Sequence, residues 1–368
     1  MDETTPVDMK TGEFADGVTF HGRWQEFLPI ALTNLLLIIV TLGIYRFWAK
    51  TRERKYLWSR TQFIDERLEW AGTGKEMFIG FLIVMAIFVP ILLFFQFGLQ
   101  ALILRGQGVL ASVLAIGLYL ALFYLAGLAL FRALRYRLSR TYWHGIRGGS
   151  DDGGWSYAGS AMLKYIIGFV TLGFLVPWAM VKLWRERWGK MSFGPYAFEP
   201  GDGPAVQGLI GRYLLIYATP VLWAILVFAL GMGTIFTAGS NPDPRVMAGM
   251  MGTFFLAVIG FYALFSLVSL AYYAVFMRKV VGEMTLGNLS FAFNARTMDW
   301  VKLILGNIAL VVLTLGFGIM YLGYRHWSFY VRHLEVQGEV DLAALTQSTT
   351  RIRSDAEGLA DAFDIGAI

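Results

Sequence analysis

The chain has 368 residues, of which 57% are hydrophobic and only 15% are charged, and its formal net charge is +5. Because a soluble domain usually has about 25% charged residues, this composition excludes an ordinary water-soluble globular protein. The chain has no cysteine, which excludes disulfide bonds, thiolate metal sites and cysteine nucleophiles.

Seven apolar stretches follow one another along the chain, and each approaches or exceeds the roughly 20 residues that a bilayer-spanning helix needs. They are residues 27–48, 77–99, 109–131, 162–181, 208–232, 250–277 and 303–324. Lipid cannot pair with backbone polar groups, so we expect these stretches to be helical. The sequence therefore predicts an all-α, polytopic membrane bundle in which four to seven of the stretches span the bilayer.

Four short stretches between the apolar ones mix β-forming and polar residues, which predicts small strands or turns at the cytoplasmic surface. They are residues 61–70, 190–198, 289–293 and 333–336. The last 29 residues alternate small, apolar and acidic side chains, and we expect them to form a cytoplasmic tail.

An internal repeat organises the chain. The sequence Thr-Leu-Gly occurs at 41–43, 171–173 and 314–316. The second copy lies 130 residues after the first, and at that offset Trp48 matches Trp178 and Pro90 matches Pro220. The repeat predicts five divisions: a polar N-terminal tail at 1–17, membrane repeats at 18–148 and 149–290, a partial repeat at 291–339, and a tail at 340–368.

A family resemblance rests on the first copy of the repeat. Phe20-His-Gly22, Asn34, TLGIYRFWAKTRERKY at 41–56 and Gly-Thr-Gly-Lys-Glu at 72–76 resemble the YjgN-like family of bacterial inner-membrane proteins. The match is strongest over residues 18–80, and the repeat extends it to about residue 340. The second copy departs from the pattern with Lys164 where the other copies have Asn. The resemblance implies a bacterial inner-membrane location and no established activity.

The distribution of Lys and Arg bears on orientation, because cytoplasmic flanks of membrane helices are enriched in these residues. Basic clusters follow the first, third, fourth, sixth and seventh stretches, whereas the two remaining loops hold only Arg105 and Arg245. If all seven stretches cross, the clusters after the third and fourth fall on opposite sides. If the three Thr-Leu-Gly stretches instead re-enter or lie at the interface, every cluster is cytoplasmic. Both alternatives stay open, and both place the C-terminus in the cytoplasm.

Three pairs of polar residues lie in the Thr-Leu-Gly stretches, seven positions apart, so that each pair shares a helix face. The pairs are Asn34 and Thr41, Lys164 and Thr171, and Asn307 and Thr314. They predict either a shared polar cluster that contacts a substrate or simple hydrogen bonding between helices.

Other candidate residues concern helix shape and lipid. Pro90 and Pro220 predict kinks, because proline removes a helical hydrogen bond. Basic residues beside apolar segments predict contact with anionic phospholipid headgroups rather than with nucleic acid. These residues are Arg52, Arg54, Lys55, Lys182 and Arg185.

The sequence offers little catalytic chemistry. No acid or histidine lies deep in an apolar stretch, and the four histidines have no metal-binding spacing. We therefore expect no cofactor, no metal site and no enzymatic activity. Two functions stay open. One is a non-enzymatic carrier, pore or lipid-handling protein; the other is a membrane scaffold that acts through its basic aromatic face and its tail.

Overall fold

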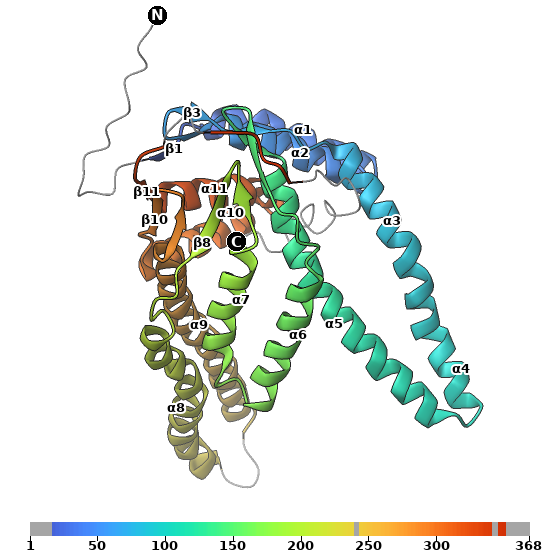
Figure 1. Cartoon of the computed structure of the whole chain (residues 1–368). Helices are drawn as coiled ribbons and strands as arrows, with labels where there is room; N and C mark the ends of the chain where they lie inside the picture. The colour runs from blue at the N-terminus through green and yellow to red at the C-terminus, as the bar shows by residue number, and fades with distance from the viewer. Residues whose placement is uncertain (1–16, 239–242, 341–344, 351–368) are drawn as a thin grey trace, which may run out of the picture.

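The structure is a computed structural model that describes residues 17–238, 243–340 and 345–350. Four of its helices have the length and apolar composition to cross a membrane. They are α3, which continues through the π-helical turn η1 (Phe94–Gly98) into α4 to cover Gly74–Leu104, then α5 (Gly108–Ser139), α8 (Gln207–Ala238) and α9 (Pro244–Gly282). They pair as two long hairpins, α3–α5 and α8–α9 (Figure 1).

The three Thr-Leu-Gly stretches form short helical hairpins. The hairpins are α1 (Trp24–Val40) with α2 (Arg46–Ser59), α6 (Trp155–Val170) with α7 (Val176–Trp188), and α10 (Thr297–Leu313) with η2 (Phe317–Tyr321) and α11 (Leu322–His333). At each apex the leucine and the glycine take left-handed backbone angles, for example φ +50° at Leu42 and +92° at Gly43. Glycine adopts this conformation readily, so the chain reverses there.

The predicted all-α fold is wrong, because the chain also forms eleven strands within its described residues. They are β1 (Val18–Phe20), β2 (Thr61–Phe63), β3 (Glu66–Arg67), β4 (Glu69–Trp70), β5 (Thr141–Trp143), β6 (Ile146–Gly149), β7 (Ser192–Phe193), β8 (Tyr196–Pro200), β9 (Met284–Leu286), β10 (Leu289–Phe293) and β11 (Leu334–Gln337). The four β-like stretches are strands as expected. They join into large sheets because hairpins from distant parts of the chain pair edge to edge, as Glu69 does with Tyr142.

The strands follow one another in chain order around an almost closed antiparallel ring. Strands β4 to β11 form one eight-stranded sheet, and β1 to β3 form a second sheet. Leu68 links the two sheets, since it lies between β3 and β4 and its N–H donates to the Thr61 carbonyl at 2.9 Å. At the other junction β1 contacts β11, where the backbone of Gly17 packs against Val336. We call this arrangement the strand ring.

Five units of similar design build the ring. Each unit is a helical hairpin followed by strands, and the five hairpins are α1–α2, α3–α5, α6–α7, α8–α9 and α10–α11. Neighbouring units contact each other through both helices and strands, and the fifth contacts the first. The 130-residue repeat in the sequence is thus one short unit plus one long unit.

Local bonds repeat between units as well. The sequence Tyr-x-x-Ser-Arg-Thr occurs at 56–61 and again at 136–141. In both copies the tyrosine hydroxyl donates to a glutamate at the start of the unit's first helix, over 3.4 Å from Tyr56 to Glu26 and 3.3 Å from Tyr136 to Glu76. The arginine of each copy pairs with the same glutamate, at 2.9 Å and 3.1 Å. These ion pairs hold the two ends of each helical hairpin together.

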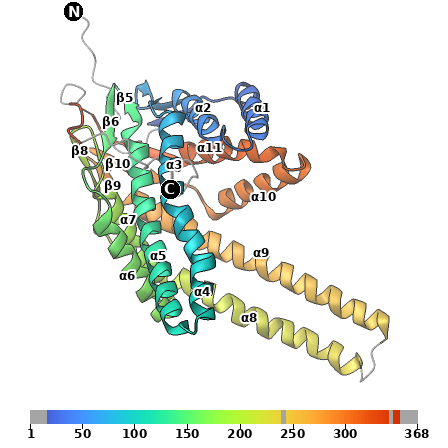
Figure 2. The same ribbon diagram turned by 90° about the vertical axis from the view of Figure 1, so that its right-hand side faces the viewer.

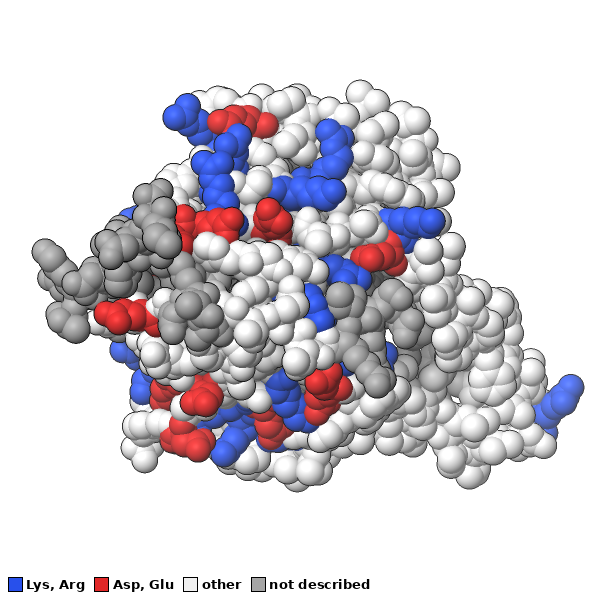
Figure 3. Space-filling view, turned by 45° about the horizontal axis from the view of Figure 1, so that its top comes forward, with Lys and Arg blue, Asp and Glu red and all other residues white. Residues whose placement is uncertain are grey.

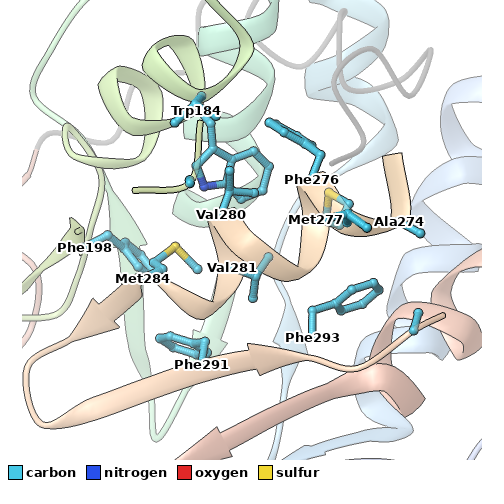
Figure 4. Close-up of a cluster of buried hydrophobic side chains, with 14 of the residues drawn as sticks. Trp184, Phe198, Ala274, Phe276, Met277, Val280, Val281, Met284, Phe291 and Phe293 are labelled. Atoms are coloured by element: carbon cyan, nitrogen blue, oxygen red, sulfur yellow. The ribbon is translucent and has the colours of Figure 1, made fainter. Parts of the chain in front are cut away.

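The apolar core lies where the helix ends meet the strands. Buried residues of α7, α9, β8 and β10, including Trp184, Phe198, Val281 and Phe293, pack together there (Figure 4). The long helices extend away from the strands (Figure 2) and expose large apolar side chains such as Phe97, Leu222 and Leu256. Charged residues gather over the ring, and the long arm beside it is almost free of charge (Figure 3). This separation fits a ring in water and arms in lipid.

Candidate functional site

A cavity of about 410 Å³ lies inside the strand ring. Its wall combines side chains from β2, β5 and β7 to β11 with the ends of α2, α5, α7, α9 and α11. Alternation along the strands places every second residue inward, as in β10, where Leu289, Phe291 and Phe293 line the cavity. On α11 the spacing of Trp327 and Tyr330 is one helical turn. The cavity is therefore a shared product of all five units.

Aromatic side chains dominate the wall. Trp58 stacks on Trp327 with a ring separation of 4.0 Å, and Trp188 packs edge-on against Phe198 at 5.0 Å. Such pairs are rigid and apolar, and they contribute beyond simple burial. The wall resembles the apolar lining of small-molecule sites, which hold a few polar groups among hydrophobic and aromatic ones.

Five tryptophans line the cavity, and their indole N–H groups fall into two classes. Three have partners: Trp58 donates to Thr141 Oγ1 at 2.9 Å, Trp143 to the Phe63 carbonyl at 2.9 Å, and Trp327 to Thr61 Oγ1 at 2.8 Å. The buried Nε1 atoms of Trp184 and Trp188 have no hydrogen-bond partner among the described residues. A buried donor without a partner costs about 1–3 kcal/mol. Both Nε1 atoms have almost no exposed surface, so a bound acceptor reaches them only when the indole rings turn.

Few other polar groups reach the cavity. They are Arg137, Thr141, Tyr196, Asn288, Tyr330 and Glu339. Burial, followed by the nearby Tyr273, raises the pKa of Tyr330, so its phenol stays protonated at physiological pH. The described wall offers hydrogen-bond donors to a ligand and holds a single carboxylate.

Part of the predicted tail contributes to the cavity. Leu345 is a wall residue, and the chain after it is bonded to the strand turns. Gln347 Nε2 donates to the Gly145 carbonyl at 2.8 Å, and Arg147 Nη1 donates to Thr350 Oγ1 at 3.1 Å. The predicted tail thus covers the ring with its residues 345–350, while 341–344 and 351–368 lie outside the described residues.

The structure places the three predicted polar pairs in three different hairpins, each bonded within its own. The first-helix residues bond to the second helix: Asn34 accepts from Arg52 Nη1 at 3.2 Å, Lys164 pairs with Glu186 at 2.6 Å, and Asn307 accepts from Arg325 Nε at 2.6 Å. We call these contacts the clasps. The threonines bond to carbonyls one turn back, and Thr41 also accepts from the Tyr45 N–H across the turn. All described hydrogen bonds of the six side chains stay within their own hairpins.

Some of the predicted lipid-contact residues are exposed, and others are bonded within the protein. Lys55, Lys182 and Arg52 are exposed. Arg54 is buried and lies 4.8 Å from the Trp70 ring centroid, and Arg185 bonds to Glu283 at 2.7 Å. Pro90 lies in α3, one turn before η1, and Pro220 lies inside α8. Both helices continue past their prolines.

The ion pair between Asp152 and Lys190 at the ring helps to lower the pKa of the Asp152 carboxyl group. Partial burial alone would raise the pKa of Asp152, but its hydrogen bond to Lys190 at 2.6 Å, the Gly154 N–H and the charge of Arg135 together lower it. The carboxylate is therefore stabilised in its charged form. This pair repeats, in the third unit, the hairpin-end ion pairs of the first two.

The cavity was missed by sequence reasoning, although one signal pointed to it. Inward-facing residues come from strands of two to five residues, too short to show alternation. The recurrence of Tyr-x-x-Ser-Arg-Thr could have located the first two helix-to-strand junctions. The groups at those junctions, Trp58 and Leu138, are wall residues.

Comparison with known proteins identifies related chains but no related structure. A family model described as a bacterial protein of unknown function (DUF898) matches residues 15–362. The inner membrane protein YjgN of Salmonella typhimurium is 24% identical over 377 residues, which cover 89% of this chain and 90% of the relative. The protein of the same name from Escherichia coli O157:H7 is 28% identical over 128 residues, and this match spans 35% of the chain and 29% of the relative. No solved structure matches.

Proposed function

Because this chain belongs to the DUF898 family of bacterial proteins of unknown function, we propose an activity from its geometry: a lipid-handling protein of the inner membrane. Relatives that match the chain are inner membrane proteins, and four helices are long and apolar enough to cross. In this proposal the strand ring holds the apolar part of an amphiphilic molecule. The long arms anchor the ring to the bilayer from which that molecule comes.

One observation carries the proposal, namely an apolar cavity with two unpartnered indole donors in its wall. A volume of about 410 Å³ falls within the range of roughly 300–1,000 Å³ for small-molecule sites. The donors of Trp184 and Trp188 suit a carbonyl, ester or carboxylate oxygen. An acyl chain with one oxygen-bearing end satisfies both features.

Binding without catalysis fits the wall better than an enzyme does. Glu339 is the only carboxylate on the described wall, which contains no histidine, serine or cysteine. A nucleophile needs a neighbouring base, and the described wall offers no such pair. The proposed role is therefore to hold or transfer a lipid-like ligand.

Orientation is the second part of the proposal. The basic clusters lie at the ring end of each unit, whereas Arg105 lies at the turn of the long arm α3–α5 and Arg245 at the start of α9. With the positive-inside bias, the ring and the C-terminus are cytoplasmic. The short hairpins then reach into the membrane from the cytoplasmic side and return, with apices such as Leu42 and Leu315 exposed to lipid.

A photoactivatable long-chain fatty acid, added to the purified full chain, tests the binding proposal. We expect crosslinks on strand-ring peptides. The double change Trp184→Phe with Trp188→Phe keeps the rings and removes both donors. It should lower labelling by about thirtyfold if each hydrogen bond contributes about 1 kcal/mol.

Trp300→Phe is the matched control, because Trp300 is also buried with an unpartnered Nε1 but is not on the cavity wall. Its labelling should equal that of the unchanged protein. Crosslinks confined to α3, α8 and the parts of α5 and α9 away from the ring would contradict the proposal, since these parts contact bulk lipid in any membrane protein.

The alternative is a membrane scaffold that binds partners through the basic aromatic face and the tail. The bonds of residues 345–350 to the ring speak against a freely available tail in this part. A stoichiometric protein partner that is captured by the whole chain and lost on deletion of residues 340–368 would favour the scaffold.

A further inference from the structure

A second hollow lies outside the ring, at the junction of the first and last units. It has a volume of about 720 Å³ and is formed by α1 on one side and by α10, η2 and α11 on the other. We call it the seam cleft, because the two units that form it are the ends of the chain's five-unit series. Its occupant would be separate from any ligand of the ring cavity.

Helix α11 separates the two hollows. Trp327 and Tyr330 face the ring cavity, whereas Arg325, Ser328 and Arg332 face the seam cleft. The second set recurs at intervals of three and four residues, as expected for one face of a helix. A change on this face therefore leaves the cavity wall intact.

Positive charge gathers at the ring end of the cleft. Lys302 and Arg332 are exposed there, with His333 and one acid, Asp299. Asp299 is engaged with its own helix, since it accepts from the Arg296 N–H at 2.9 Å and lies 4.0 Å from Lys302. Arg325 follows further along, bonded through Nε to Asn307. The cleft therefore has three side chains that are always positively charged and one carboxylate that already has partners. This excess of positive charge favours binding of an anion.

The opposite end of the cleft is apolar. Leu310 of α10 lines it, whereas Leu303 of the same helix and Leu28 of α1 line the part nearer the ring. Since α10 and α11 run antiparallel, Leu310 lies opposite Tyr321, toward the exposed apex at Leu313 and Leu315. The cleft thus changes from cationic to apolar along its length, in the direction from water into lipid.

An independent polar group lies at the apolar end. The buried Tyr321 hydroxyl lines the cleft and has no hydrogen-bond partner among the described residues. The oxygen atom has almost no exposed surface, so an occupant at this end meets the Tyr321 ring.

We propose that the seam cleft binds one anionic phospholipid, with the headgroup phosphate on Lys302, Arg325 and Arg332. Its ester oxygens lie toward Arg325, and an acyl chain continues along Leu310 to the Tyr321 ring. Exposed residues such as Lys55 and Lys182 can contact headgroups of the surrounding bilayer without any cleft. Variants can therefore distinguish this general contact from binding in the seam cleft.

The test uses the full chain in nanodiscs made of phosphatidylglycerol or of phosphatidylcholine, followed by native mass spectrometry of lipids that stay bound. We expect one retained phosphatidylglycerol. Lys302→Gln with Arg332→Gln should lower its retention by about tenfold or more, because each basic residue at a membrane surface contributes about 1 kcal/mol. Tyr321→Phe should leave retention unchanged, because the acyl chain meets the ring and not the hydroxyl.

Lys55→Gln with Lys182→Gln is the matched control, since it removes the same charge from exposed positions on α2 and α7. It should retain the lipid. Equal loss in the control, or equal retention of phosphatidylcholine, would overturn the proposal. So would full displacement of the lipid by inorganic phosphate, because that would show a phosphate site without an acyl site.

Discussion

The short hairpin α6–α7 and the long hairpin α8–α9 are neighbours in the ring, but only the long one has helices that are long enough to cross the membrane. Both lead into strands that pair antiparallel, β7–β8 and β9–β10. The short hairpin turns back at Leu172-Gly173 and is clasped by Lys164 and Glu186. The long one runs through 32 and 39 residues in its two helices.

The difference shows that one supersecondary unit can serve two purposes by changing its length. A helix rises about 1.5 Å per residue, so the 16 residues of α6 fall short of a bilayer of about 30 Å, whereas α8 and α9 exceed it. The short hairpins also carry polar groups that a lipid-exposed crossing would have to desolvate. The clasps satisfy these groups within the hairpin.

The largest expected effect concerns topology. The native chain has no cysteine, so single cysteines can be placed at Ser59, at Ser192 and at Gln107. We expect a membrane-impermeant thiol reagent to label the first two only from the cytoplasmic side and the third only from the opposite side. Labelling of Ser59 and Ser192 from opposite sides would show that the hairpin α6–α7 crosses the membrane.

A smaller effect is expected from opening a clasp. Lys164→Met removes the partner of Glu186 and leaves that carboxylate with only the Ser160 hydroxyl at 2.5 Å. Because Lys164 is buried and Glu186 is partly exposed, we expect a loss of about 1–3 kcal/mol in the free energy of unfolding. An unfolding titration in mixed micelles measures it.

Lys182→Met on α7 controls for the loss of a positive charge, because Lys182 is exposed. It should change the free energy of unfolding by less than about 0.5 kcal/mol. If both variants lose the same stability, the clasp does not hold the short hairpin together.

The smallest expected effect comes from the turn. Gly43→Ala or Gly316→Ala adds a methyl group that meets no atom within 4 Å, so steric clash is absent and only the positive φ is penalised. We expect a loss of about 1 kcal/mol in the free energy of unfolding. Gly117→Ala, in open space on the long helix α5, should instead be neutral or stabilising. An equal change in the free energy of unfolding at Gly43 and Gly117 would show that the positive φ at the turn does not cause the loss.

The sequence predicted the long helices well because run length is a local property. Residues 109–131 and 250–277 fall inside α5 and α9. The repeat was also visible, since Thr41 and Thr171 occupy the same place in two turns. The strand ring was not predicted, because its pairs join residues such as Phe198 and Leu286 that lie far apart in the chain.

The candidate polar residues show the same limit. Helical spacing put Asn307 and Thr314 on one face, as the structure has them. Their partners depend on where the chain turns back, since Arg325 reaches Asn307 only across the hairpin. The ring cavity depends on strands from all five units at once, and no single stretch of sequence contains it.

The contact between β1 and β11 has a consequence for biosynthesis. Strand β1 is synthesised before every other strand of the ring, but its neighbour across the junction is made only after residue 333. During the interval β1 has an uncovered edge, and such edges pair readily with other chains. The edge of β1 is therefore covered only when the last unit has been synthesised. Truncated transcripts that lack this unit would yield products that tend to aggregate.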